Sequence, residues 1–387
     1  FYGCTSLTQA PELPATTLVN GCYNQMFKGC SNLNYIKCLA TDIISAYNRT
    51  NSWVNGVSAT GTFVKDVNSS WTVGVSGIPE GWIVEEVINA VTFTAEESGS
   101  TIGLISLSSN QTLEYKTASS DWTSMSTSTN ITLNNIGDKV YVRGMLSEDN
   151  TYSNNTQFTM TGKINASGNC NALWNYSDLD APLKKYCGFC MFKGCTSLTT
   201  APELPATTLA DSCYGNMFYN CTGLTQAPEL PATTLAYSCY NGMFYGCTSL
   251  TTAPELPATT LANRCYEYMF RDCTSLTQAP ELPATTLVQN CYYQMFYGCT
   301  SLTTAPELPA TTLNFACYSN MFSGCTSLIT APELPATTLV DYCYSYMFSG
   351  CSNINYIKCL ATDISATDCT TNWVSSVSST GTFVKAE

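Results

Sequence analysis

Apolar residues recur at intervals of four along much of the second half of the chain. In one representative stretch, Leu209, Cys213 and Met217 follow one another at i, i+4 and i+8, flanked by Tyr214 and Phe218. Residues four apart share one face of an α-helix, so this pattern predicts an amphipathic helix of about three turns. The apolar stripe is expected to face a core, and the polar residues between its members are expected to face solvent.

The residues after this segment predict a strand and an extended crossing. Cys221–Thr225 is short and rich in threonine, which favours a β-strand. Pro228 and Pro231 interrupt any helix and favour an extended chain that returns to the next helix. Each coil is thus expected to contain a strand, a crossing and a helix, with strands of successive coils about 4.8 Å apart in a parallel ladder.

A 26-residue repeat organises these elements. The nonapeptide Ala-Pro-Glu-Leu-Pro-Ala-Thr-Thr-Leu occurs seven times, first at Ala10 and then every 26 residues from Ala201 to Ala331. Cysteines keep the same step from Cys187 to Cys343, and a second set follows eight residues later. One unit has too few apolar residues to fold alone, whereas stacked units share a continuous core. The repeat therefore predicts a solenoid of 26-residue coils.

These coils resemble the BspA-type leucine-rich repeats of bacterial surface proteins. The family's Ala-Phe-x-x-Cys-x-x-Leu core segment is matched by residues 217–224, and the resemblance covers about residues 1–65 and 187–387. This unit is longer than the family's commonest length, and Cys213 stands where a branched aliphatic residue is usual. The resemblance implies an exported adhesin at a bacterial cell surface, which binds host proteins, other cells or glycans.

Both repeat regions end in the same way. Residues 31–42 and 352–363 are nearly identical, and each is followed by a Trp-Val pair, at Trp53 and Trp373, and by Thr-Gly-Thr-Phe-Val-Lys. We expect each segment to be a closing coil that seals the open end of the core, the first of them continuing into a last strand at residues 77–84. This recurrence also predicts a tandem super-repeat within a longer polypeptide.

Residues 88–168 contain neither a cysteine nor the repeat. About seven short segments of alternating apolar and polar residues, separated by turn residues, are typical of a small β-sandwich and resemble immunoglobulin-like spacer domains. We therefore predict an α+β chain in three parts. A leucine-rich-repeat solenoid, present as its C-terminal part with a closing cap, spans 1–87; an all-β immunoglobulin-like sandwich spans 88–168; a second solenoid with caps at both ends spans 169–387.

Composition narrows the function. The 387 residues include no histidine, which removes histidine-dependent catalysis and histidine-containing metal sites. The excess of 28 acidic over 15 basic residues argues against nucleic acid, because phosphate binding needs a basic face. No apolar run approaches the roughly 20 residues of a membrane span. We expect a protein without enzymatic activity, cofactor or metal, and without membrane insertion in this segment.

The 22 cysteines admit two interpretations. They can pack as small buried residues with inert thiols, or they can form disulfides, which an exported protein permits. Zinc is not favoured, because the one Cys-x-x-Cys pair, Cys187 and Cys190, has no second pair. Cys170 and Cys190, which lie outside the repeat frame, are the first candidates for a disulfide, and Cys359 with Cys369 are the second.

Seven positions in each coil vary while the rest barely change, and they are rich in Tyr, Asn, Ser, Gly and Asp. The same residue types serve antibody paratopes, because tyrosine provides contact area at low entropic cost and small polar residues provide adaptable hydrogen bonds. The variable positions are expected to form a ligand-binding outer surface, or alternatively to reflect drift at exposed sites. The expected binding residues are Asn216, Tyr219, Tyr237, Tyr245, Asn263, Arg264, Tyr268, Arg271, Tyr293, Tyr297, Phe315, Tyr342 and Tyr346.

A repeated glutamate, from Glu203 to Glu333, predicts an acidic ladder. A solvated acidic edge explains it, and weak Ca²⁺ binding is the alternative. A glycosidase needs two carboxylates in different environments, which identical glutamates in identical coils do not provide.

Three hypotheses for function remain. The first is a surface-exposed or secreted protein that mediates adhesion or receptor binding, with a protein or glycan on another cell as its partner. The second is a structural spacer or a fibre, such as a phage tail fibre, that self-associates without a specific ligand. The third is a carbohydrate-binding accessory module.

Overall fold

The structure is a computed structural model that describes residues 1–15, 17–41, 49–66 and 69–386. Contacts divide the chain into two units, Phe1–Ile88 and Asn89–Glu387, and each has its own hydrophobic core. The three-part division of the chain into two solenoids and an immunoglobulin-like domain stays a prediction.

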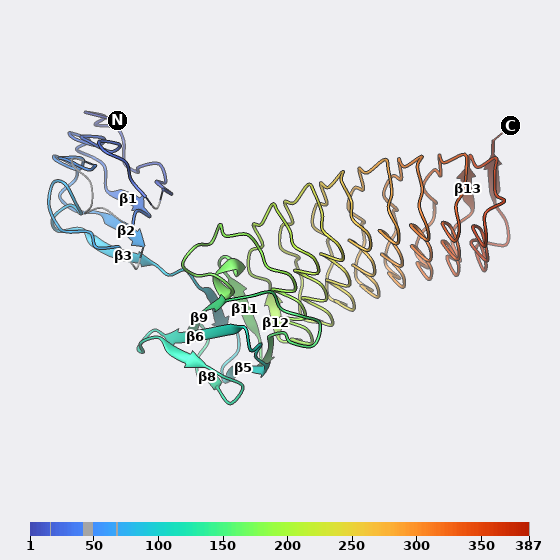
Figure 1. The fold of residues 1–387 in the computed structure, drawn as a ribbon, viewed down its shortest axis with the longest axis horizontal. Coiled ribbons are helices and arrows are strands. Elements are labelled where there is room, and N and C mark those ends of the chain that lie inside the picture. The colour runs from blue at the N-terminus through green and yellow to red at the C-terminus, as the bar shows by residue number, and fades with distance from the viewer. Residues whose placement is uncertain (16, 42–48, 67–68, 387) are drawn as a thin grey trace. The chain divides into compact units, whose positions relative to one another are not determined.

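Both units are built almost entirely from short strands and turns (Figure 1). Within the described ranges one 3-10 helix occurs, η1 (Cys170–Leu173). The strands are β1 (Tyr35–Cys38), β2 (Thr62–Asp66), β3 (Ile83–Val87), β4 (Val91–Ala95), β5 (Ser100–Ser106), β6 (Gln111–Thr117), β7 (Thr123–Met125), β8 (Asn130–Leu133), β9 (Lys139–Leu146), β10 (Gln157–Thr161), β11 (Ile164–Ser167), β12 (Leu198–Thr200), β13 (Tyr356–Cys359) and β14 (Thr382–Lys385).

The first unit contains a parallel sheet of order β1-β2-β3. Its core centres on Phe27, Trp53 and Phe63, whose side chains are fully buried. The strand expected at residues 77–84 is β3, which begins at Ile83 and adds the third strand beside β2.

The second unit begins with two sheets around a shared core. One has the order β10-β5-β8, and the other has the order β12-β11-β4-β9-β6-β7, in which the β11–β12 pair is parallel and the other pairs are antiparallel. Inward residues alternate along β4 and β9, as the two-residue period of a strand requires. Phe93, Val140 and Phe158 are among the fully buried residues. An immunoglobulin-like domain here stays a prediction.

From Cys187 onward the chain winds into stacked 26-residue coils, which lie side by side in Figure 1. The Tyr214 N–H donates to the Cys239 carbonyl of the next coil at 3.0 Å, and the Phe218 N–H donates to the Met243 carbonyl at 2.9 Å. Between these bonds, alternate N–H groups close tight turns within the coil. Backbone hydrogen bonds thus pass from one coil to the next at every second residue of this segment.

The expected helices are absent from the coils, so the prediction of an α+β fold with short helices was wrong. Residues 213–220 form consecutive turns, and Ser212, Asn216 and Asn220 have φ values of 53°, 52° and 56°. A left-handed residue at every fourth position prevents a right-handed helix from forming. A four-residue repeat places apolar residues at i, i+4 and i+8 as a helix does, which explains the error.

The expected strand at residues 221–225 is reduced to isolated contacts. Gln226 forms single parallel bridges with Thr200 and Thr252, and strands at this position are β12 in the first coil and β13 in the closing coil. Each coil also contains two prolines that lack N–H donors, such as Pro228 and Pro231. A continuous parallel ladder therefore cannot form across this part of the coil.

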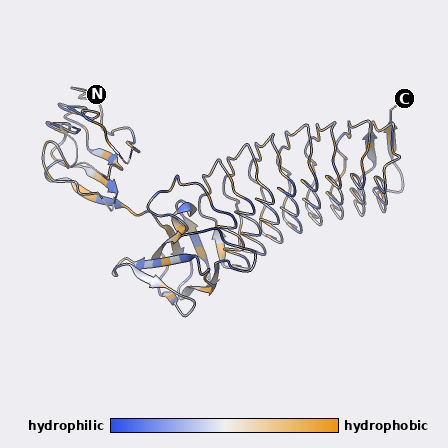
Figure 2. Ribbon diagram, viewed as in Figure 1, coloured by the Kyte–Doolittle hydropathy of each residue, from blue (hydrophilic) through white to orange (hydrophobic). Residues whose placement is uncertain are grey.

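The core of the array consists of columns, each built from one residue type in successive coils. The phenyl rings of Phe244 and Phe270 lie 5.6 Å apart with an interplanar angle of 8°. Tyr266 and Tyr292 belong to a second column, with rings 5.9 Å apart at 4°. Figure 2 shows apolar residues recurring from coil to coil. Near-parallel ring stacking extends along the whole array, so neighbouring coils stabilise one another.

Neither expected disulfide is formed in the structure, where all 22 cysteines are described and all are free thiols. Burial is the main cause of the raised pKa of both the Cys187 and the Cys190 thiol. Cys170 and Cys190 are both buried and unpaired. Cys359 and Cys369 are likewise unpaired.

Cys369 takes part in two hydrogen bonds that involve sulfur. Its Sγ donates to the Ile364 carbonyl at 3.3 Å, and its backbone carbonyl accepts from Cys343 Sγ at 4.0 Å. In the middle of the array, burial raises the pKa of the Cys265 thiol to about 12, so this thiol is protonated and unreactive at neutral pH.

The two sheets and the coil array share one hydrophobic core. β11 pairs with β12 of the first coil. The ring of Phe192 stacks on Phe158 from β10 at 5.3 Å and on Phe218 from the next coil at 5.6 Å. The aromatic column of the coils therefore continues into the space between the sheets.

Candidate binding surface

The coils bury two adjacent residues and then leave the next two outside the hydrophobic core. Cys213 and Tyr214 are fully buried, as are Met217 and Phe218, and the pairs between them are excluded from the core. We call the surface formed by residues 211–212, 215–216 and 219–220, with their equivalents up to 349–350, the turn face. The second residue of each pair adopts a positive φ, which favours Asn, Asp and Gly.

All thirteen expected binding residues lie on the turn face, and none is buried. Several large side chains are well exposed, including Tyr237 at 46%, Phe315 at 42% and Tyr346 at 39%. Outward side chains of successive coils stand next to one another, so residues far apart in the sequence form continuous rows. Two groups of side chains stand out along these rows.

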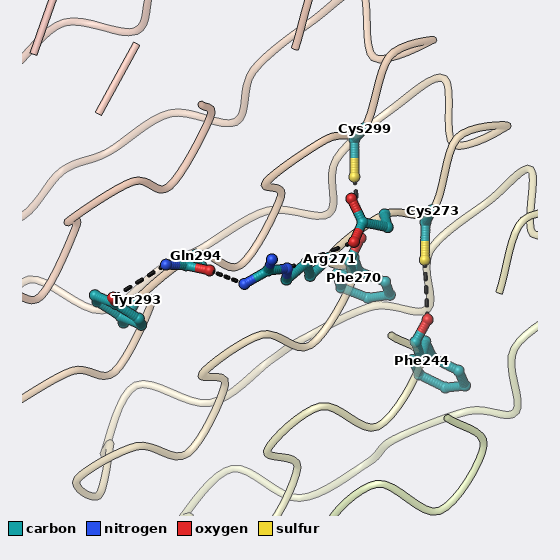
Figure 3. Close-up of polar contacts among 8 residues, drawn as sticks. Phe244, Phe270, Arg271, Cys273, Tyr293, Gln294 and Cys299 are labelled. Atoms are coloured by element: carbon teal, nitrogen blue, oxygen red, sulfur yellow. Dashed lines mark hydrogen bonds and ion pairs between the residues drawn. The ribbon is translucent and has the colours of Figure 1, made fainter. Parts of the chain in front are cut away.

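The first group surrounds Arg271 (Figure 3). Its guanidinium lies 4.5 Å from the ring centroid of Tyr297 and 5.2 Å from that of Tyr245. Arg271 also donates to the Gln294 side chain, whose Nε2 donates to the Tyr293 hydroxyl at 3.0 Å. Cation–π contacts and hydrogen bonds therefore fix this positive charge among aromatic rings. Tyr219 extends the group by packing its ring edge against Tyr245 at 4.5 Å.

The second group encloses a hollow of about 500 Å³. Tyr268 and Tyr293 meet edge to face at 5.5 Å, and Phe315 and Tyr342 pack together at 5.4 Å. We call this site the aromatic hollow. Its lining comprises Arg264, Glu267, Tyr268, Asn290, Tyr293, Phe315, Ala316, Ser319, Asn320, Tyr342, Ser345 and Tyr346.

Polar groups converge on the aromatic hollow. Glu267 is 4% exposed, and its Oε2 accepts from Asn241 Nδ2 at 2.8 Å and lies 3.8 Å from Arg264 Nη1. Burial raises the pKa of the Glu267 carboxyl, an effect opposed by Arg264 and then by Asn241. Asn290 is 9% exposed, and its buried Oδ1 has no hydrogen-bond partner among the described residues. A buried acceptor without a donor is costly, and Asn290 Oδ1 is covered by its neighbours, so a ligand in the hollow reaches this oxygen only when the side chain moves.

A family model for the BspA type leucine rich repeat region matches residues 179–303 and 255–368, with six copies. Residues 179–368 of this chain form a BspA-type leucine-rich repeat region. The matched residues include the whole aromatic hollow and the Arg271 group. Comparison with curated proteins and with solved structures gave no significant match.

The BspA-type coils bring together most of the expected binding residues. Arg264, Tyr268, Tyr293, Phe315, Tyr342 and Tyr346 line the aromatic hollow, and Tyr219, Tyr245, Arg271 and Tyr297 belong to the Arg271 group. Asn216, Tyr237 and Asn263 lie on the turn face outside both groups. Their binding role stays a prediction, as does that of the other ten.

Sequence reasoning did not select Glu267 and Asn290 as binding residues. Both occupy variable positions, and Glu267 places a carboxylate on a face where tyrosine and small polar residues dominate. That local change in chemistry was the available signal. The burial of Asn290 depends on its neighbours in adjacent coils, which a single repeat does not reveal.

The repeated glutamates of the BspA-type coils are solvent-exposed. The last of them, Glu333, is bound by Lys358 of the closing coil, with Nζ and Oε2 2.9 Å apart. In the described part of the chain, no group of three or more His, Cys, Asp or Glu side chains is arranged to hold a metal ion. No helix in those same ranges has the length and apolar character of a membrane span.

Proposed function

We propose that this BspA-type protein is a non-enzymatic, secreted or cell-surface protein whose solenoid mediates adhesion or receptor binding through the turn face. The partner in this proposal is a protein or glycan on another cell. The aromatic hollow is the single observation that carries the proposal. It combines five aromatic residues with a buried hydrogen-bond acceptor that lacks a donor, Asn290 Oδ1.

The chemistry of the hollow favours a ligand with both apolar and hydrogen-bonding surface. Tyr268, Tyr293 and Tyr342 present ring area together with hydroxyl groups, as the side chains of adaptable binding surfaces do. The charge of Glu267 is already balanced by Arg264 and by the Asn241 hydrogen bond. A ligand without net charge therefore fits the hollow better than a strongly charged one.

The ring contacts also support binding without a large rearrangement. Tyr268 and Tyr293 already pack against each other, and the same is true of Phe315 and Tyr342. Side chains held in this way lose little additional conformational freedom when a ligand arrives, which favours affinity.

A test compares a variant with Tyr268, Tyr293 and Tyr346 all changed to alanine with a control variant, Tyr152→Ala. Tyr152 is an exposed tyrosine outside the turn face. Binding to intact cells, immobilised matrix proteins and a glycan array is measured for each protein. The triple variant is expected to lose binding by at least about thirtyfold, since truncating a single central aromatic contact costs about 2 kcal/mol.

The Tyr152→Ala variant is expected to bind like the parent protein, and thermal unfolding should show that all three proteins are folded. A folded triple variant that binds every partner as well as the parent would exclude the aromatic hollow as the binding site. A parent protein that binds none of the three targets would favour the spacer hypothesis, for which the uniformly stacked phenylalanine column provides the stiffness.

A further inference from the structure

The aromatic hollow extends along the coil array and lies inside it, with further coils on both sides. Its lining comes from four successive coils, those of Cys265, Cys291, Cys317 and Cys343. Each of these coils contributes at least one aromatic side chain to the lining. A ligand that fills the hollow therefore meets an aromatic ring at every coil that it crosses.

The backbone around the hollow offers no free edge to a peptide strand. Tyr268 and Asn320 donate their N–H groups to carbonyls of the next coil at 2.9 and 2.8 Å, whereas Tyr293 and Ser319 donate within their own coils at 3.3 Å. In the same way, each of the twelve lining residues uses its backbone N–H in a hydrogen bond. An added peptide strand gains its affinity from main-chain hydrogen bonds, so a ligand of this hollow is recognised by side chains instead.

Ring faces and hydroxyl donors occur together in the hollow, where Phe315 and Tyr346 are 42% and 39% exposed. The Tyr346 hydroxyl accepts from Asn372 Nδ2 at 3.0 Å. The Tyr293 hydroxyl accepts from Gln294 Nε2 at the same distance. These bonds hold the two tyrosines in place and leave each hydroxyl hydrogen available to a ligand. A sugar ring has the complementary surface, since its C–H groups pack on aromatic rings and its hydroxyl groups accept and donate hydrogen bonds.

The charges around the hollow are already paired. Arg264 Nη1 lies 3.8 Å from Glu267 Oε2 in the lining itself. The neighbouring Arg271 is outside the lining, and its Nε lies 3.5 Å from Asp272 Oδ2. A carboxylate or sulfate group on a ligand would therefore lose hydration without gaining an unpaired cation, whereas the hydroxyl groups of an uncharged sugar carry a much smaller cost.

The period of the coils suits a linear glycan better than an extended peptide. The phenylalanine column runs through the same four coils, and its rings lie 5.6, 5.6 and 5.8 Å apart from Phe270 to Phe348. One sugar unit of a linear glycan has a similar length, so successive sugars meet successive coils. Side chains on one face of an extended peptide lie about 6.6 Å apart, because each residue advances about 3.3 Å, and they fall out of step with the coils.

We propose that the aromatic hollow binds an uncharged linear oligosaccharide that lies along the array, with about one sugar unit for each of the four lining coils. Its sugar rings stack on Phe315 and on the tyrosine rings of the neighbouring coils. Its hydroxyl groups accept hydrogen bonds from the Tyr293 and Tyr346 hydroxyls. This inference rests on the proposed function, because both concern the same hollow, and it narrows the ligand of that hollow to a glycan without charge.

The first experiment measures binding of the full chain to intact cells after two treatments. Periodate oxidation cleaves the vicinal diols of sugars and leaves peptide bonds intact, and sialidase removes charged sugars. Binding by the parent chain is expected to fall after periodate to the level of the variant with Tyr268, Tyr293 and Tyr346 changed to alanine, and to stay unchanged after sialidase. Binding that requires the three tyrosines but survives periodate, or that is lost after sialidase, would overturn the uncharged glycan and leave the proposed function standing.

The second experiment uses an array of uncharged linear tetrasaccharides and their sulfated counterparts, with thermal unfolding as the check that each variant is folded. The parent chain and Phe315→Tyr are expected to bind the same uncharged tetrasaccharides equally, and more tightly than the sulfated ones. Phe315→Leu should bind at least about fivefold more weakly, because leucine is apolar but has no flat ring face. Equal binding by the leucine and tyrosine variants, a preference for sulfated glycans, or no binding to any tetrasaccharide would overturn the proposal.

Discussion

The two cysteine columns of the array look alike in sequence but differ in hydrogen bonding. Cys273 Sγ donates to the Phe244 carbonyl of the preceding coil at 3.0 Å, and Cys299 Sγ donates to the Phe270 carbonyl at the same distance (Figure 3). The fully buried Cys265 thiol donates no such bond to a neighbouring coil among the described residues, and in its column Cys187 and Cys343 donate over the longer distances of 3.7 and 4.0 Å. The first column therefore ties the coils together more closely than the second does.

This difference predicts that serine destabilises the two positions by different amounts. In Cys273→Ser the new hydroxyl can still donate to the Phe244 carbonyl, so the free energy of unfolding should fall by less than about 1 kcal/mol. In Cys265→Ser the buried hydroxyl has no comparable acceptor in a neighbouring coil, which should cost about 1–3 kcal/mol. Urea unfolding, monitored by circular dichroism, measures the free energy of unfolding of both serine variants. The two Cys→Ala variants are the controls for lost packing. Equal losses for the two serine variants would contradict the assigned roles.

At the scale of the element, the turn segment depends on residues that tolerate a positive φ. Gly324 has a φ of 78°, and its equivalents in other coils include Asn220 and Asp272, with φ values of 56° and 58°. Glycine, asparagine and aspartate are the residues that adopt this conformation at low cost. A side chain at Gly324 would meet no closer atom than the Cα and N of Gly298, at 3.7 Å. The backbone conformation, rather than the available space, therefore limits which residues this position accepts.

Substitutions at Gly324 separate these two effects. Gly324→Asn should change the free energy of unfolding by less than about 1 kcal/mol, whereas Gly324→Val should cost about 2 kcal/mol or more, because a β-branched residue is strained at positive φ. Differential scanning calorimetry of the two variants provides the measurement. A valine variant as stable as the asparagine variant would show that the turn conformation is not required.

The limits of sequence prediction are clearest in this element. The 26-residue period, the buried Cys and Met residues and the exclusion of the variable positions from the apolar core could be read from the sequence. The burial of some variable residues, such as Glu267 and Ser345, could not. The helix could not be told from the turn segment by apolar spacing, because both place residues such as Cys213 and Met217 four apart. The distinguishing signal was the Asn, Gly or Asp that stands before the second cysteine of every coil, as in Asn220, Gly246 and Asp272.

The candidate site shows a second limit. The residue types at the variable positions predicted that tyrosines such as Tyr268 and Tyr293 belong to a ligand-binding surface. The hollow itself arises because small residues, including Ala316, Ser319 and Ser345, lie among these rings. That arrangement depends on the alignment of successive coils, which became visible only in three dimensions.

At the scale of the second unit, aromatic packing joins the coils to the sheets. Phe192 contacts Phe158 from β10 at 5.3 Å, Phe93 from β4 at 6.2 Å and Phe218 from the next coil at 5.6 Å. Phe322 lies between Phe296 and Phe348 within the array, at 5.6 and 5.8 Å. The two phenylalanines are equally buried, but Phe192 alone of the pair contacts both structural regions.

Alanine at these two positions should therefore destabilise different parts of the unit. Phe192→Ala and Phe322→Ala should each cost about 3–5 kcal/mol, since both remove a buried ring from a packed column. In a repeat array, a loss of stability in one coil mainly affects its nearest neighbours. Hydrogen exchange in β4 and β10 is therefore expected to increase in Phe192→Ala and to stay at the parent level in Phe322→Ala, as measured by mass spectrometry of peptides from residues 91–95 and 157–161. Unchanged exchange of these strands in Phe192→Ala would mean that the sheets are stable without the array, whereas faster exchange in both variants would mean that the unit unfolds as one cooperative body.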